Sequence, residues 1–108
     1  MELRTVQQGT FAFLPPLTDE QIRDQLQWIL DQGYVVSVEY TDDPSPRNLF
    51  WRMWGLPMFD VKDAAAVWLE FEACRKAFPD QYIKINGYDP IRQGQAVSFV
   101  AHWPDAGR

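Results

Sequence analysis

Residues that usually build catalytic or metal-binding sites are scarce in this sequence. Its 108 residues include one cysteine, Cys74, and one histidine, His102. A single cysteine excludes an internal disulfide and suits a reducing compartment such as the cytosol. There is no Cys/His spacing typical of a zinc site and no glycine-rich phosphate-binding loop. The sequence therefore gives little support to a catalytic or metal centre within this chain.

Positive charge and long apolar runs are also in short supply. Lys and Arg number 10 against 15 Asp and Glu, which gives a formal net charge of −5 and a pI near 4.6. An acidic chain without a basic cluster is a poor partner for nucleic acid. No apolar run is long enough to cross a membrane, and the charged start at residues 1–4 is unlike a signal peptide. We therefore expect no nucleic-acid partner and no membrane partner.

Aromatic residues, in contrast, are abundant and make up 15% of the chain. So much aromatic area does not fit one small core, and Trp and Tyr are enriched at protein interfaces. The length fits a single domain over residues 1–108. We expect an extended N-terminal arm at residues 1–16, because Gly9 and two adjacent prolines argue against a helix there, and a short tail at 104–108. The arm packs either on its own domain or on a partner.

The first helix is well marked in the sequence. Thr18 and Gln21 form a capping box that starts it, and Gly33 ends it. Its apolar residues fall on a single stripe, made of Ile22, Leu26, Ile29 and Leu30. Trp28 lies away from this stripe, which makes it a candidate interface residue.

Two strands are predicted next, at residues 34–41 and 49–54, with a proline-containing loop between them. The loop is short, which makes the strands an antiparallel pair. The second strand places large aromatic residues on both faces, Trp51 on one and Phe50 and Trp54 on the other. A surface strand of a small monomer should be polar on one side. This strand is therefore expected to lie between two layers or against another chain.

The end of the second strand is equally unusual. Gly55-Leu56-Pro57 is expected to end it, because Pro57 has no amide hydrogen and holds Leu56 extended. Met58 and Phe59 then place apolar side chains in a turn, which suggests that a partner or a neighbouring helix covers them.

The second half of the chain predicts one helix and two further strands. The helix begins near residues 60–63, where an aspartate can cap it. Its apolar stripe consists of Ala64, Val67, Phe71, Cys74 and Phe78. Cys74 is thus most simply a core thiol, while Leu69 is left on the opposite side. Strands are predicted at residues 81–88 and 95–103.

This order of elements predicts an α+β fold, in which a four-stranded antiparallel sheet carries two helices packed on one face. Aromatic residues on both faces of the strands suggest that another chain covers the open face of the sheet or its ends.

Three chemical roles are conceivable for the polar residues, and each has a more ordinary alternative. A nucleophile–base pair would need His102 with Ser98 or Cys74, but no catalytic motif surrounds them. A hard cation would need carboxylates, and turn or helix-start positions explain the four candidates, Asp42, Asp43, Asp60 and Asp63. The net negative charge disfavours base stacking, for which the candidates are Arg47, Arg52 and Arg92.

Four blocks of the sequence, in order, resemble one known family. The most specific is Trp51-Arg52-Met53-Trp54-Gly55-Leu56-Pro57-Met58-Phe59, which resembles the Tyr-Trp-x-Met-Trp-x-Leu-Pro-Met-Phe signature of the small subunit of form I ribulose-1,5-bisphosphate carboxylase/oxygenase (Rubisco). The arm resembles the family's Thr-Leu-Ser-Tyr-Leu-Pro-Pro-Leu in the run Thr10-Phe11-Ala12-Phe13-Leu14-Pro15-Pro16-Leu17. The second helix ends in a third block, Cys74-Arg75-Lys76-Ala77-Phe78-Pro79. The fourth is Gly87-Tyr88-Asp89-Pro90-Ile91-Arg92-Gln93-Gly94-Gln95-Ala96-Val97-Ser98-Phe99-Val100-Ala101, similar to Gly-Phe-Asp-x-x-Arg-Gln-x-Gln-x-x-Ser-Phe-x-Ala.

The resemblance implies the Rubisco small-subunit fold and a non-catalytic subunit that binds no cofactor or metal. Eight small subunits would cap and stabilise a core of eight large subunits and tune carboxylation turnover and CO2/O2 specificity. Mg²⁺ and a carbamylated lysine are then expected on the large subunit. Because the sequence shows no transit peptide, we expect a mature or prokaryotic chain, located in the cytoplasm or in a carboxysome.

The resemblance also assigns residues to the contacts of such an assembly. Those expected to contact the large subunit are Thr10, Phe11, Phe13, Leu14, Pro15, Trp28, Trp51, Met53, Trp54, Leu56, Pro57, Met58, Phe59, Tyr88 and Arg92. Those expected in the loop at the central channel, near other small subunits, are Asp42, Asp43, Pro44, Ser45, Pro46, Arg47 and Asn48. The sequence also departs from the family, since this loop is shorter than in plants and resembles the red-type version, while the last block resembles the green type.

Two alternatives come from other functional classes. A free-standing regulatory domain would use its aromatic face as a small-molecule pocket and would be stable alone. An independent enzyme would depend on a reactive His102 or Cys74, and replacing either would abolish its activity.

Overall fold

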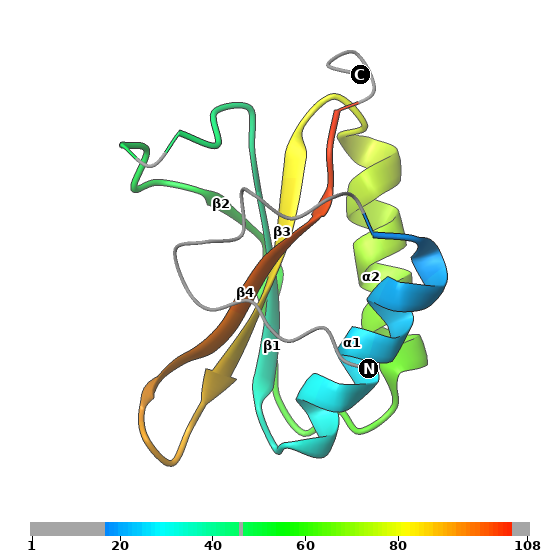
Figure 1. Cartoon of the computed structure of the whole chain (residues 1–108), viewed down its shortest axis with the longest axis vertical. Helices are drawn as coiled ribbons and strands as arrows, with labels where there is room; N and C mark the ends of the chain where they lie inside the picture. The colour runs from blue at the N-terminus through cyan, green and yellow to red at the C-terminus, as the bar shows by residue number, and fades with distance from the viewer. Residues whose placement is uncertain (1–16, 46, 105–108) are drawn as a thin grey trace.

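The computed structural model describes residues 17–45 and 47–104 of the chain (Figure 1). Its elements follow the predicted order of helices and strands. They are α1 (Asp19–Asp31), β1 (Val35–Thr41), β2 (Arg52–Met58), α2 (Ala64–Ala77), β3 (Tyr82–Asp89) and β4 (Gly94–His102). The predicted arm, Pro46 and most of the tail lie outside the described residues.

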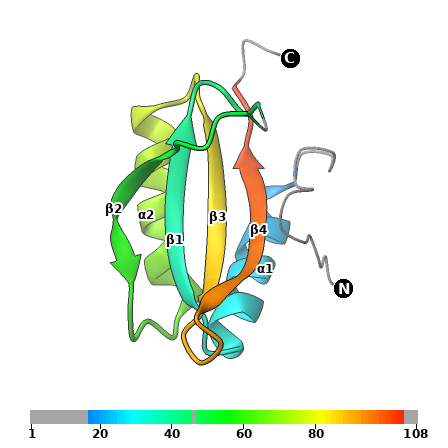
Figure 2. The same ribbon diagram turned by 90° about the vertical axis from the view of Figure 1, so that its left-hand side faces the viewer.

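The four strands form one antiparallel sheet in the order β2-β1-β3-β4. Both helices lie on one face of this sheet, as Figure 1 shows from the side. Figure 2 looks onto the opposite face, which neither helix covers. The predicted α+β fold is confirmed.

The start and end of α1 are built as the sequence predicts. The Thr18 hydroxyl accepts a hydrogen bond from the Gln21 amide at 3.1 Å, and the Gln21 side chain accepts one from the Thr18 amide at 2.9 Å. These two bonds satisfy amides that the first helical turn leaves unpaired. Beyond the helix, Gly33 adopts a φ of +84°, which glycine accommodates without strain.

The core lies between the helices and the sheet. The predicted stripe of α1 is buried there, and so are Val67, Phe71 and Cys74 of α2. Asp63 caps α2 by accepting a hydrogen bond from the Ala65 amide at 2.9 Å. On β3, a side chain at Gly87 would come within 2.9 Å of Ile29. The absence of a side chain at this position lets the end of α1 pack directly on the sheet.

The bounds predicted for β2 were wrong. The strand begins at Arg52 and runs through Gly55-Leu56-Pro57 to Met58. Gly55 has a φ of +67°, and the register shifts there, with Trp54 opposite Val38 but Met58 opposite Val36. The strand therefore bulges and continues. Pro57 is tolerated because β2 is at an edge of the described sheet, a position at which proline is compatible with a strand.

Candidate functional site: the β2 surface

Five large apolar side chains are exposed on β2 and in the residues next to it. We call them the β2 surface: Leu49 (91% exposed), Phe50 (79%), Met53 (43%), Leu56 (79%) and Phe59 (65%). The core of the chain is already filled by other residues, so this surface is additional apolar area that the described chain leaves in water. Exposed apolar clusters of this kind mark contact sites for other proteins.

The sequence predicted only part of this surface. Met53, Leu56 and Phe59 were named as contact residues and are exposed. Leu49 and Phe50 were recognised as apolar strand residues but not as contact candidates, and both precede the strand. The signal that could have identified them is their position between a polar loop and a strand that is already apolar on both faces.

The Trp54 side chain packs mainly against residues of its own chain. Its ring lies edge-on to Tyr40 at 6.4 Å and to Phe78 at 6.1 Å, measured between ring centroids. Its indole N–H donates a hydrogen bond to Glu70 of α2 at 3.1 Å. Met58 also packs against the core, and Pro57 is half-buried. Their contact with a partner stays a prediction.

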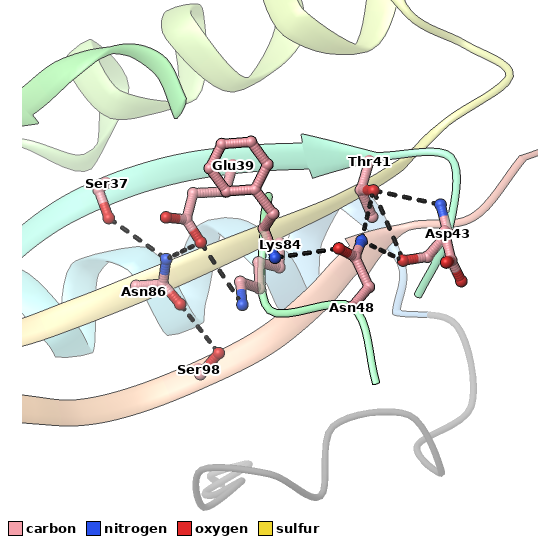
Figure 3. A network of polar contacts seen from close by, with 9 residues as sticks. Ser37, Glu39, Thr41, Asp43, Asn48, Lys84, Asn86 and Ser98 are labelled. Carbon is pink, nitrogen blue, oxygen red and sulfur yellow. Dashed lines mark hydrogen bonds and ion pairs between the residues drawn. The ribbon is translucent and has the colours of Figure 1, made fainter. Parts of the chain in front are cut away.

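The open face of the sheet carries a polar network that the sequence analysis missed (Figure 3). The Asn86 amide donates to the Ser37 hydroxyl at 3.3 Å and to the Glu39 carboxylate at 3.1 Å. The Ser98 hydroxyl donates to Asn86 at 2.9 Å, and Lys84 pairs with Glu39 at 3.4 Å. These residues satisfy one another's hydrogen-bonding groups, so the middle of this face does not need a partner.

Hydrogen bonds tie together the described residues of the loop between β1 and β2. The Asn48 side chain donates to the Thr41 hydroxyl at 3.0 Å and to the Asp43 carbonyl at 2.7 Å. The same side chain accepts a hydrogen bond from the Phe50 amide at 3.0 Å. Asp43 accepts one from the Ser45 amide at 3.0 Å. Asn48 therefore ties both ends of the loop together just before Leu49.

A second exposed group lies at the end of the sheet where β2 finishes. Val36 pairs with Met58, and the adjacent Val35 pairs with Tyr88, so these residues share one end of the sheet. Trp28 packs edge-on against Tyr34, the residue before Val35, at 6.3 Å between ring centroids, and both Trp28 and Tyr88 are exposed. Ile91 lies in the β3–β4 turn and is 90% exposed, although the sequence analysis did not select it. Whether these residues touch a partner stays a prediction.

The residues considered for catalysis are used elsewhere in the described structure. His102 Nε2 lies 3.0 Å from the Pro79 carbonyl, and Ser98 donates to Asn86. Cys74 is buried, and this burial raises the pKa of its thiol to about 12. The thiol is thus neutral and a poor nucleophile at physiological pH.

Two further features bear on the candidate roles. Within residues 17–45 and 47–104, no three His, Cys, Asp or Glu side chains are grouped as a metal site would require. Neither of the described helices has the length and apolar character needed to span a membrane.

Comparison with known proteins gives a consistent result. Residues 8–104 match the family described as ribulose bisphosphate carboxylase, small chain. The Rubisco small subunit of Cyanidioschyzon merolae is 54% identical, over 92% of this chain and 73% of the relative. That of Xanthobacter flavus is also 54% identical, over 93% of this chain and 77% of the relative. Among solved structures, Rubisco from Galdieria partita superposes with a TM-score of 0.83 at 46% identity, over 93% of this chain and 74% of that one.

These findings confirm the resemblance carried by the four sequence blocks and favour it over a free-standing regulatory domain. The relatives come from red algae as well as bacteria, so a prokaryotic source stays a prediction. The chain belongs to the ribulose bisphosphate carboxylase small-chain family, the auxiliary subunit of that enzyme.

Proposed function

We propose that this chain assembles with Rubisco large subunits, capping and stabilising an octameric core as one of eight small subunits. The observation that carries the proposal is the β2 surface, where apolar side chains remain exposed although the core is complete. Permanent complexes bury surfaces of this kind, commonly above about 2,000 Å² in total. The membership of the chain in the small-chain family indicates that the partner is the large subunit.

The contact is centred on β2 and extends to the end of the sheet that carries Trp28, Tyr88 and Arg92. These groups lie along one edge and at one end of the sheet, so a single partner surface can contact them together. We place the β1–β2 loop at the central channel of the assembly, near other small subunits. The N-terminal residues from Thr10 to Pro15 are proposed as further contacts because they match the family's arm.

The chemistry belongs to the large subunit, on which Mg²⁺ and a carbamylated lysine are expected. The small subunit tunes carboxylation turnover and CO2/O2 specificity by holding large subunits in place. Such indirect positioning is effective, because a displacement of about 1 Å at a reacting centre can reduce a rate about 100-fold. We propose a cytoplasmic complex in a prokaryote and a carboxysome as its alternative location, which fractionation of source cells would distinguish.

Light scattering with parallel carboxylation assays tests the proposal. The chain is measured alone, and again after mixing with a cognate large-subunit core. We expect one particle that contains both chains, no activity in the small chain alone, and altered turnover or CO2/O2 specificity in the complex. A stable small chain that ignores the core would refute the proposal, and a metabolite screen against its aromatic residues would then follow.

A further inference from the structure

Trp51 immediately precedes β2 and turns back onto its own sheet. The ammonium group of Lys84 lies 4.3 Å from the centroid of the Trp51 ring. Lys84 is on β3, and β1 separates β3 from β2. The Trp51 side chain therefore reaches past β1 on the open face of the sheet. A cation at this distance from an indole face is attracted by its π electrons.

Lys84 is itself held from two sides. Its cross-strand neighbour is Glu39, and the two charges pair at 3.4 Å. Glu39 is fixed in turn by the amide of Asn86 at 3.1 Å (Figure 3). The Lys84 side chain is only 14% exposed and that of Glu39 22%. A shielded, hydrogen-bonded charge pair keeps one geometry better than an exposed pair.

The residues between the loop and β2 are thereby fixed at both ends. On the loop side, the Asn48 side chain accepts a hydrogen bond from the Phe50 amide and donates hydrogen bonds to Thr41 and Asp43. On the strand side, Trp51 rests on Lys84. Leu49 and Phe50, the two residues between these anchors, keep 91% and 79% of their surface exposed. Their backbone is tied to the domain while their side chains face water.

We propose that Lys84 is a positioning residue, which acts through Trp51 to hold Leu49 and Phe50 ready to bind the large subunit. The inference rests on the proposed function and deepens it. Lys84 has little surface to offer a partner, so its effect on binding is indirect. A contact segment that is ordered before binding loses less conformational entropy on association, which raises its affinity.

The test compares variants of the full chain in reconstitution with the large-subunit core. Lys84→Met keeps the aliphatic stem and removes the charge, and Lys84→Arg keeps a cation over the ring. Trp51→Leu removes the ring itself. Lys76→Met is the matched control, because it removes a positive charge from the exposed end of α2. Lys84→Met/Glu39→Gln avoids an unpaired carboxylate and protects the fold.

We expect Lys84→Met and the double variant to lower affinity for the core about tenfold, and Lys84→Arg to stay within about threefold of the unmodified chain. Adding Lys84→Met to Trp51→Leu should cause no further loss of affinity, because both substitutions remove the same contact between Lys84 and Trp51. Hydrogen exchange at the Phe50 amide should accelerate in Lys84→Met while core amides keep their protection. Lys76→Met should behave as the unmodified chain.

Three results would overturn the inference. The first is an affinity of both Lys84→Met variants equal to that of the unmodified chain. The second is additive losses of affinity from the Lys84 and Trp51 substitutions. The third is hydrogen exchange that accelerates equally throughout the core. If the unmodified chain itself fails to bind the core, the proposed function fails instead. In that case exchange at Phe50 still reports whether Lys84 orders this segment.

Discussion

Helix α2 and the segment from Leu49 to Phe59 are both rich in apolar residues, yet the two differ in what covers them. In α2, Val67, Phe71 and Cys74 are completely buried in the core of their own chain. In the other segment, Leu49, Leu56 and Phe59 are exposed.

The difference follows from periodicity. Helical spacing places the apolar residues of α2 on one stripe, which a single sheet face can cover. The β2 segment is apolar on both faces and in the flanking turns, and a small domain has only one core to offer. Apolar content beyond what one core can hold therefore indicates a partner. Five changes would break or sharpen this contrast.

The largest effect is expected from Phe71→Ala, which leaves a cavity between α2 and the sheet. The free energy of unfolding should fall by about 3–5 kcal/mol. Chemical denaturation of the chain alone measures it. Leu69→Ala, on the exposed side of the same helix, is the matched control and should change stability by less than about 0.5 kcal/mol. Equal losses in the two variants would contradict the assigned core.

Trp54→Ala should affect both the stability of the chain and its assembly, because Trp54 packs on Tyr40 and Phe78 and borders the β2 surface. We expect a loss of about 2–3 kcal/mol in the free energy of unfolding and weaker assembly with large subunits. Denaturation and size-exclusion chromatography report the two effects separately. An unchanged complex would remove Trp54 from the predicted contacts.

Cys74→Ala should reveal whether water is excluded from the core around α2, through the pH dependence of the free energy of unfolding. Burial raises the pKa of the thiol from 9.0 to about 12. Because the folded pKa is the higher one, this stabilisation is complete below about pH 9 and is lost as the pH rises toward 12. Over that range the unmodified chain should lose up to about 1.4 kcal/mol more per pH unit than Cys74→Ala. If the free energies of unfolding of the two proteins changed equally with pH, the thiol would be hydrated in the folded chain.

Leu56→Ser should separate assembly from stability. This side chain is exposed, so the free energy of unfolding should stay within about 0.5 kcal/mol. Affinity for the large-subunit core should fall about tenfold, the size expected for a central contact residue. Leu69→Ser, an exposed leucine on α2, is the matched control for binding titrations. A similar loss in Leu69→Ser would show that the partner also covers the helix layer.

Asp19→Asn should have the smallest effect, because an exposed ion pair contributes less than burial. Arg75 donates two hydrogen bonds to Asp19, at 2.9 and 3.2 Å, and holds the pKa of that carboxyl below its usual value. The variant should lose less than about 1 kcal/mol. The difference should persist above about pH 4 and vanish as the pH falls through the lowered pKa. A constant difference down to low pH would mean that charge is not its cause.

Sequence patterns predicted the helices well because their signals are local. The capping box at Thr18 and the stripe containing Phe71 and Cys74 are readable within a few residues, and the structure confirms them. The end of β2 was not predictable in the same way. Pro57 normally argues against a strand, and only the position of β2 at the sheet edge makes it acceptable.

The candidate site was predicted in composition but not in arrangement. The aromatic run indicated a contact surface, yet Trp54 is half-buried in its own chain while Leu56 and Phe59 are exposed. The polar network could not be predicted, because Glu39 and Lys84 meet only through the cross-strand register of β1 and β3. Residues far apart in sequence carry no local signal of such a meeting.

The bulge at Gly55 and the proline at position 57 have a consequence for the chain before assembly. A newly synthesised subunit must remain dispersed with apolar side chains in water until a partner arrives. An exposed, regular edge strand would invite another copy to add its own strand and begin an aggregate. The irregular backbone at Gly55 and the missing amide hydrogen of Pro57 interrupt the template that such growth requires. The same edge can therefore bind a complementary surface of a partner while resisting the addition of strands that forms fibres.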